Sequence, residues 1–187
     1  RKPRRYRSNG INLIINHGVF HPGFFFSTQY LLGYLKGVNL ESKKVLELGA
    51  GSGLLAFYAN QKDAIVSASD ISATVIKNLK ENLVRNSKNF EIIHSDLFDN
   101  FGTEVFDIVL INPPYYKREP RTEADLAWFC GKNSEYFTKL FHQLPKYINK
   151  NSVVLMVLSE DCAFDEIAQF AIQNNLSFSI ISKRRIW

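Results

Sequence analysis

The sequence predicts a doubly wound α/β domain of the Rossmann-like type, with helices on both faces of a mostly parallel sheet. From Lys43 onward, short apolar runs alternate with amphipathic stretches, and a glycine-rich segment follows the first of these runs. Strict alternation of strands and helices requires crossover connections, which are typical of parallel sheets. Ligands of such sheets bind at the carboxyl ends of the strands. We therefore expect the functional residues to follow directly after the apolar runs.

The expected strands are short apolar runs, and the expected helices carry their apolar residues on one face. Strands are expected at residues 45–48, 64–68, 90–94, 105–111, 153–158 and 177–181. Helices are expected at residues 28–36, 54–60, 72–85, 134–147 and 164–174. Residues 11–20 alternate loosely and predict a short strand or hairpin, which the turn His21-Pro22-Gly23 would end.

Length and composition indicate a single domain over residues 1–187. Of the 187 residues 45% are hydrophobic, and a chain of this size buries roughly 70% of its unfolded surface in one core. No apolar run reaches the roughly 18 residues that a membrane span needs, and the basic start lacks the apolar stretch of a secretory signal. Cys130 and Cys162 are far apart in the sequence, so neither a disulfide framework nor a cysteine zinc site is indicated. We expect a soluble, cytoplasmic protein.

The formal net charge of +5 originates in the first seven residues. Five positive charges lie there, and the remaining 18 basic residues balance 18 acidic ones. The five are Arg1, Lys2, Arg4, Arg5 and Arg7. A basic arm can bind phosphate backbones, whereas a short terminal run is more often a solvated tail. We expect a flexible basic arm at residues 1–10, a lead-in strand, turn and helix at 11–40, and the Rossmann-like core at 43–187.

A metal site is not expected. His17 and His21 are four residues apart, which is the spacing of two metal ligands on one helix turn. The glycines and the proline around them disfavour a helix, and the other two histidines are remote in the sequence.

A glycine-rich loop joins the first core strand to the first core helix. It reads Glu47-Leu48-Gly49-Ala50-Gly51-Ser52-Gly53. Gly49, Gly51 and Gly53 would allow a ligand to lie against the backbone at the helix N-terminus, although such glycines also serve tight packing of strand and helix. The spacing is G-x-G-x-G, whereas the dinucleotide fingerprint is G-x-G-x-x-G with room for a pyrophosphate. A nucleoside without phosphates therefore fits this loop better than a dinucleotide.

Acidic residues follow the next two strands. Asp70 stands 21 residues after Gly49, where a carboxylate can accept both hydroxyls of a ribose. It could instead cap the following helix, although Ser72 also offers a cap. Asp96 could accept a hydrogen bond from an adenine amino group while Leu97 packs against the ring, or it could be an ordinary turn residue.

The tetrapeptide Asn112-Pro113-Pro114-Tyr115 follows the apolar run at residues 105–111. Two prolines remove backbone donors and fix φ, so the strand must end and nearby acceptors remain unpaired. The Asn112 side-chain oxygen and the Pro113 carbonyl could each accept one hydrogen of an NH2 group, while Tyr115 stacks on its π-system. An ordinary strand-ending turn with a buried tyrosine would fit the same four residues.

In this order, the four strand ends resemble those of the class I S-adenosylmethionine-dependent methyltransferases, over roughly residues 17–158. The tetrapeptide is similar to that of enzymes that methylate planar amide or amino nitrogens, above all the release-factor glutamine methyltransferases. Val19-Phe20-His21-Pro22 before Thr28 resembles the family's lead-in that closes over the cofactor. Ala127-Trp128 followed by Gly131-Lys132-Asn133 is similar to the stretch that follows the tetrapeptide in short, single-domain members.

The resemblance implies S-adenosyl-L-methionine as the cofactor and methyl transfer to a nitrogen, a reaction in which orientation matters most. The implied catalytic residues are Asn112, Pro113 and Tyr115. The implied cofactor-binding residues are Thr28, Glu47, Gly49, Gly51, Gly53, Asp70, Ile71, Asp96, Leu97 and Asn112. The partner is a protein whose glutamine is methylated, such as a peptide-release factor, or RNA or DNA methylated at adenine. A nicotinamide-dependent (NAD) oxidoreductase and a non-catalytic cofactor-binding module are the competing classes.

Several features depart from the family's pattern. Where the family usually places arginine or acidic residues near Pro22, this chain has Gly23-Phe24-Phe25-Phe26. The chain also stops at Trp187, where the family continues into a seventh, antiparallel strand, and it starts without methionine and without the helical recognition domain of bacterial members. We expect a sequence truncated before the final strand.

Overall fold

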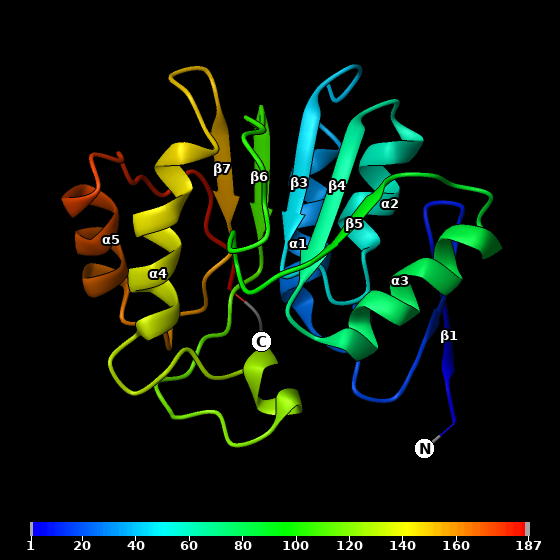
Figure 1. The fold of residues 1–187 in the computed structure, drawn as a ribbon, viewed down its shortest axis with the longest axis horizontal. Helices are drawn as coiled ribbons and strands as arrows, with labels where there is room; N and C mark the ends of the chain where they lie inside the picture. Colours follow the sequence, from blue (N-terminus) through cyan, green and yellow to red (C-terminus); the bar gives the residue numbers. More distant parts are fainter. Residues whose placement is uncertain (1, 186–187) are drawn as a thin grey trace.

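A five-stranded parallel sheet forms the centre of the computed structural model, which describes residues 2–185 (Figure 1). The strand order is β5-β4-β3-β6-β7. The strands are β3 (Lys44–Leu48), β4 (Ile65–Asp70), β5 (Glu91–His94), β6 (Ile108–Ile111) and β7 (Val153–Met156). The chain moves outward from β3 in one direction and from β6 in the other, so strand order reverses between these two strands. This topology confirms the predicted fold class and places the ligand crevice at the β3–β6 junction.

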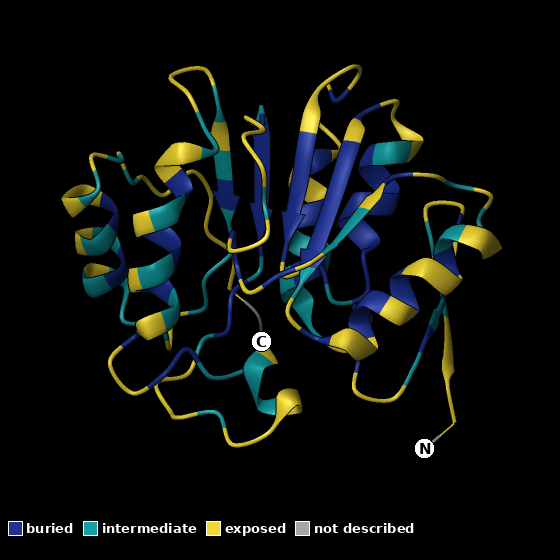
Figure 2. Ribbon diagram, viewed as in Figure 1, coloured by how far each residue is buried: buried dark blue, intermediate teal, exposed yellow. Residues whose placement is uncertain are grey.

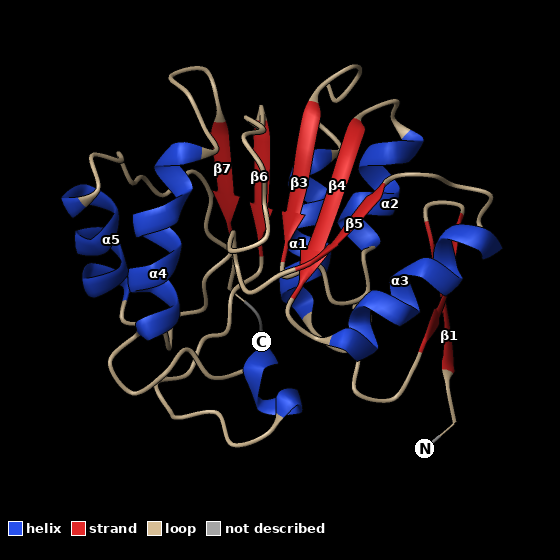
Figure 3. Ribbon diagram, in the orientation of Figure 1, coloured by secondary structure: helices blue, strands red, loops and turns tan. Residues whose placement is uncertain are grey.

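Helices cover both faces of the sheet, as Figure 3 shows. They are α1 (Phe26–Leu35), α2 (Leu54–Gln61), α3 (Ala73–Arg85), α4 (Glu135–Gln143) and α5 (Phe164–Gln173), with 3-10 turns η1 (Glu123–Ala127) and η2 (Leu144–Lys146). Alternate strand residues face opposite sides, so Val45 packs in the core with α1 and α2, whereas Leu46 packs in the core with α4 and α5. None of the described helices is long and apolar enough to cross a bilayer.

Burial differs between the central and the outer strands (Figure 2). All four residues of β6 are buried, because helices cover both of its faces and a strand lies on each side. Such a strand is expected to read as a continuous apolar run, which is how residues 108–111 read. The outer strands β5 and β7 are only partly buried.

The N-terminal basic segment is not a flexible arm. Arg4–Ser8 forms β1, which pairs antiparallel with β2 (Ile11–Ile15). Asn9 and Gly10 both have positive φ, as a two-residue hairpin turn requires. The prediction of a flexible arm at residues 1–10 is therefore wrong for this stretch, and Arg1 lies outside the described residues. The Asn-Gly pair was the sequence signal for this hairpin.

The expected strand at residues 177–181 does not form. Phe178 packs edge-on against Phe164 of α5 at 5.3 Å between ring centroids, so this segment covers α5 rather than the edge of β7. It then reaches α1, where the Tyr30 hydroxyl donates a hydrogen bond to Ser182 Oγ at 2.7 Å. The predicted strands and helices elsewhere are present with shifted ends. Helix α4 ends earlier than expected, at Gln143, because Pro145 in the following turn η2 cannot donate a backbone hydrogen bond.

Candidate active site

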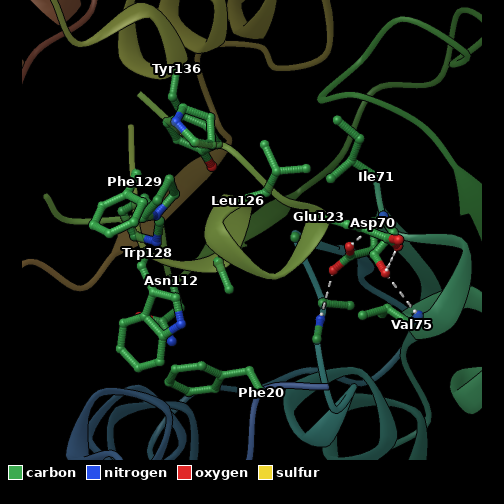
Figure 4. Close-up of a pocket in the computed structure, with 18 of the residues that line it drawn as sticks. Phe20, Asp70, Ile71, Val75, Asn112, Glu123, Leu126, Trp128, Phe129 and Tyr136 are labelled. Carbon is green, nitrogen blue, oxygen red and sulfur yellow. Dashed lines mark hydrogen bonds between the residues drawn. The ribbon is translucent and has the colours of Figure 1, made fainter. Parts of the chain in front are cut away.

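A cavity of about 660 Å³ opens at the carboxyl ends of the central strands (Figure 4). Its size suits a ligand of nucleoside dimensions or somewhat larger. The predicted site residues that line it are Thr28, Glu47, Gly49, Gly51, Asp70, Ile71, Asp96, Leu97, Asn112, Pro113 and Tyr115. The fold therefore brings together residues that are spread over almost ninety positions of the sequence.

Gly53 is the predicted site residue that does not line the cavity. It precedes α2 with φ of 75°, and a Cβ atom added there would lie 2.4 Å from Leu79 Cδ2 of α3. Its lack of a side chain therefore serves the packing of α2 against α3. Gly51 also has a positive φ, and its amide points to Asp70, as described below.

Glu47 ends up buried at the base of the cavity, near the end of β3. Its Oε2 accepts a hydrogen bond from the Ala56 amide, in the first turn of α2, at 2.7 Å. Burial raises the pKa of Glu47 to about 8, although hydrogen bonds from the backbone amides of Ala56 and Leu55 lower it. The side chain is therefore largely protonated at neutral pH, and a cationic group in the cavity would favour its ionised form.

Asp70 is the last residue of β4, and two backbone amides anchor its carboxylate. Its Oδ2 accepts from Gly51 N at 3.0 Å, and its Oδ1 accepts from Ser72 N at 2.9 Å. Ser72, and not Asp70, caps α3, because its hydroxyl accepts from Val75 N. Burial raises the pKa of Asp70, and the charge of nearby Glu123 adds to this effect. Each carboxylate oxygen retains a lone pair for a ligand hydroxyl.

Asp96 is fixed by a side chain rather than by backbone amides. This side chain comes from α4, which packs on the face of the sheet opposite to α3. Lys139 of α4 donates to Asp96 Oδ2 at 2.6 Å and to Asp99 Oδ2 at 2.6 Å. The Asp96 side chain is 47% exposed. Leu97 beside it is buried and has φ of 50°. Sequence reasoning missed Lys139, since a lysine on an amphipathic helix has no local signal for a partner 43 residues away.

Asn112 lies in a chain of hydrogen bonds made by side chains. The Tyr115 hydroxyl donates to Asn112 Oδ1 at 2.5 Å, and Asn112 Nδ2 donates to Thr28 Oγ1 at 3.4 Å. These contacts fix which end of the amide points to which neighbour. Burial raises the pKa of Tyr115 to about 12, so its hydroxyl stays a donor at neutral pH. The sequence predicted a stacking role for Tyr115 and an unpaired Asn112 oxygen, whereas this oxygen already accepts one hydrogen bond.

An aromatic cluster lies beside Asn112 and was also missed. Phe20 stacks on Phe25 with ring centroids 4.4 Å apart, and Trp128 packs against Phe25 at 4.8 Å. Trp128 belongs to the segment 116–130, which is closed at its base by hydrogen bonds from Tyr116 N to Trp128 O and from Cys130 N to Tyr116 O, both at 2.9 Å. This segment, termed the cover, carries η1.

The cover is fastened to the opposite side of the cavity by Glu123. The Ser72 hydroxyl donates a hydrogen bond to the Glu123 carboxylate, next to Asp70 (Figure 4). A capping box between Thr122 and Asp125 holds η1 itself. Within residues 2–185, no group of three or more metal-ligating side chains is assembled.

Comparison with known proteins identifies the family. The sequence model of the methyltransferase small domain matches residues 10–169. The chain belongs to this methyltransferase family. The competing class of nicotinamide-dependent oxidoreductases is thereby excluded.

Relatives of this methyltransferase differ in their named substrates. A protein of Methanocaldococcus jannaschii, provisionally named a protein N5-glutamine methyltransferase, is 33% identical over 80% of this chain and 77% of its own length. A release factor glutamine methyltransferase of Lactococcus lactis is 39% identical over 62% of this chain. A ribosomal RNA small subunit methyltransferase C of Alcanivorax borkumensis is 26% identical over 81% of this chain. The match spans less than half of the latter two relatives, 47% and 42% of their lengths.

Solved structures repeat the fold of this methyltransferase. A T. thermophilus 16S rRNA N2 methyltransferase, in complex with AdoMet and guanosine, superimposes with a TM-score of 0.69 at 19% identity. The superposition covers 92% of this chain and 45% of the other. At this identity the likeness supports the shared Rossmann-like architecture.

Proposed function

We propose that this methyltransferase transfers a methyl group from S-adenosylmethionine to the side-chain amide nitrogen of a protein glutamine. The observation that carries the proposal is the hydrogen-bond chain Thr28–Asn112–Tyr115, which fixes a side-chain amide at the edge of the cavity. A fixed amide oxygen can orient an NH2 group, and orientation can contribute about 7–11 kcal/mol to such a reaction.

The residues at the ends of β3, β4 and β5 fit the methyl donor. Asp70 would accept the ribose hydroxyls, Asp96 would accept from the adenine amino group, and the Gly49–Gly51 backbone would lie against the ligand. Ser69 Oγ, which lines the cavity, is buried and has no hydrogen-bond partner among the described residues, as expected for a group that a ligand satisfies. The donor supplies an electrophilic methyl group next to a cation, whose charge would favour ionised Glu47.

The acceptor side would hold the substrate nitrogen. Asn112 Oδ1 and the Pro113 carbonyl would each accept one N–H, leaving the nitrogen's remaining electron pair directed at the methyl group. The nitrogen–carbon bond forms as the sulfur–carbon bond breaks, and the nitrogen then loses one proton to water. The hydrogen bonds to Tyr115 and Thr28 would keep the Asn112 amide from turning over, so that its oxygen rather than its NH2 group would face the substrate.

The names of two of these relatives favour glutamine as the acceptor, and a second candidate is adenine in RNA. The aromatic cluster of Phe20, Phe25 and Trp128 favours this alternative, because Phe20 and Trp128 line the cavity near Asn112 and could pack against a base. We place the reaction in the cytoplasm, since Cys130 and Cys162 are free thiols, as expected in a reducing compartment.

Transfer of a labelled methyl group tests this assignment. The chain would be incubated with S-adenosylmethionine carrying a tritiated methyl group and, separately, with a peptide-release factor, ribosomal RNA and transfer RNA. Label is expected in the release factor, and replacing its acceptor glutamine by glutamate should abolish the signal. Label in RNA alone would replace glutamine by adenine as the acceptor, and label in none would favour a non-catalytic cofactor-binding module.

A further inference from the structure

Two terminal segments of the chain meet at the three consecutive phenylalanines Phe24, Phe25 and Phe26. The guanidinium carbon of Arg4, in β1, lies 4.8 Å from the centroid of the Phe24 ring. The guanidinium carbon of Arg184, near the other end of the chain, lies 4.8 Å from the centroid of the Phe26 ring. Segments from opposite ends of the sequence therefore each place an arginine over a phenylalanine ring, and the two phenylalanines are two positions apart.

Charge is distributed unevenly between these segments and the rest of the chain. Of the 23 basic residues, five lie in residues 1–7 and three in residues 183–185, where there are no acidic residues. The intervening residues carry 15 basic against 18 acidic side chains, a formal charge of −3. The positive net charge of the protein is thus confined to the two segments that converge here.

Phe24 and the two arginines are exposed, His21 and Phe26 are partly buried, and the arginines lack anionic partners among the described residues. Phe24 is 59% exposed, and His21 stacks on it with ring centroids 4.0 Å apart. Arg4 and Arg184 are exposed, and neither forms an ion pair within residues 2–185. Their side chains are held by aromatic rings, so the guanidinium donors stay free for an external anion.

The surface is connected to the wall of the active-site cavity through Phe25. Phe25 lies between Phe24 and Phe26 and directs its ring into the aromatic cluster. There it packs against Phe20 and Trp128, which line the cavity. A molecule bound at Phe24 and Phe26 would therefore lie one residue away from the wall of the active site.

We propose that the arginine–phenylalanine surface, defined as Arg4, His21, Phe24, Phe26 and Arg184, binds single-stranded RNA. Phosphates would take the free guanidinium donors, and unpaired bases would stack on the outer faces of the flat guanidinium groups, whose inner faces lie over the phenylalanine rings. An acidic protein would use the charge alone, whereas this surface combines the charge with aromatic and planar faces. The inference does not depend on whether glutamine or adenine is methylated.

Fluorescence anisotropy with a labelled, unstructured 12-nucleotide RNA tests the proposal. The double variant Arg4→Ala, Arg184→Ala should bind the RNA at least tenfold more weakly than the parent chain. It should also lower the slope of log affinity against log salt by about 1.4, because each phosphate that a side chain neutralises on a single strand contributes about 0.7 to that slope. The matched control Lys77→Ala, Lys80→Ala removes two exposed charges from α3 and should change the affinity less than twofold.

Two further measurements separate RNA from other polyanions. Polyglutamate of equal charge should bind more weakly than the RNA, and Arg4→Lys, Arg184→Lys should weaken RNA binding while leaving polyglutamate binding unchanged. Equal affinity for both polymers, or an unchanged RNA affinity in the alanine variant, would overturn the proposal. Melting followed by circular dichroism verifies that the variants fold. The single variant Arg184→Ala, outside any helix or strand, provides the same test if the change in β1 prevents folding.

Discussion

On the β3–β4 side of the cavity, polar side chains are fixed by backbone amides, whereas on the β6 side they are fixed by one another. Asp70 accepts from two backbone amides and Glu47 from a third. Asn112 is fixed by the side chains of Thr28 and Tyr115. Figure 4 shows Asp70 and Asn112 on different sides of the pocket.

This difference in anchoring indicates which side of the cavity can change its ligand specificity through substitutions. Backbone amides are set by the strand-to-loop geometry, so the β3–β4 side suits a ligand that does not change, such as a cofactor. Side-chain partners can be exchanged without altering the backbone, so the β6 side suits the acceptor. We term these the cofactor side and the acceptor side, and the following substitutions test whether they act separately.

The largest effect is expected for Asn112→Ala on the acceptor side. The rate of methyl transfer at saturating cofactor should fall about 100-fold, since a misplaced acceptor can cost that much, while cofactor affinity stays nearly unchanged. Single-turnover kinetics and calorimetry with S-adenosylhomocysteine measure the two quantities. Asn112→Asp is the matched control, because a carboxylate keeps the acceptor oxygen and should retain more activity. Full activity in Asn112→Ala would mean that the tetrapeptide is only a strand-ending turn.

A smaller and opposite pattern is expected for Asp70→Ala on the cofactor side. Removing charge-assisted hydrogen bonds should weaken cofactor binding by about 1.5–3 kcal/mol, which is roughly 10–150-fold. The rate at saturating cofactor should change little. Titration calorimetry gives the affinity, and a thermal melt verifies folding. Unchanged affinity in a folded variant would reduce Asp70 to an anchor for the Gly51 and Ser72 amides.

Tyr115→Phe removes one hydroxyl from the acceptor side and should act more mildly. The Asn112 amide would lose one of its two side-chain partners, a contribution of about 0.5–1.5 kcal/mol, so the rate should fall roughly 2–12-fold. Cofactor affinity is expected to remain the same. Steady-state kinetics with the identified substrate measure the change. A rate equal to that of the parent chain would show that Thr28 alone orients Asn112.

Lys139→Ala should have the smallest effect. Its pair with Asp96 is largely exposed, and such pairs contribute little to binding or stability, so we expect cofactor affinity to change less than about fivefold. Calorimetry with S-adenosylhomocysteine measures the cofactor affinity of Lys139→Ala. Comparing the loss of affinity with that of Asp70→Ala shows how much each aspartate depends on its anchor. A decrease as large as that for Asp70→Ala would mean that Asp96 also depends on a fixed geometry.

Local sequence patterns predicted the parts of this molecule that depend on local chemistry. The buried run of β6, the glycine-rich loop and the proline-terminated strand each carry their reason in adjacent residues. The strand ends then meet because parallel topology aligns them, so the sequence alone was enough to assign Asp70, Asp96 and Asn112 to one cavity. The Asn9-Gly10 hairpin also had a local signal, although composition alone suggested a flexible arm.

Interactions between distant segments could not be predicted in this way. The partner of Lys139 lies 43 residues away, and the Ser72 hydroxyl meets Glu123 across 51 residues. The failure of residues 177–181 to form a strand has the same cause, because Phe178 packs against Phe164 and Phe141 instead of an adjacent strand. Which partner Phe178 contacts depends on the assembled fold. The apolar pattern of residues 177–181 is equally compatible with a strand and with a segment that packs on α5.

The double variant Asp70→Ala, Asn112→Ala tests the separation of the two sides most directly. If they are independent, it should bind S-adenosylhomocysteine as weakly as Asp70→Ala and no more weakly. Its single-turnover rate at saturating cofactor should equal that of Asn112→Ala, because distant sites without shared partners are additive within about 0.5 kcal/mol. A further decrease of affinity beyond Asp70→Ala, or of rate beyond Asn112→Ala, would show that cofactor and acceptor are held by one coupled site.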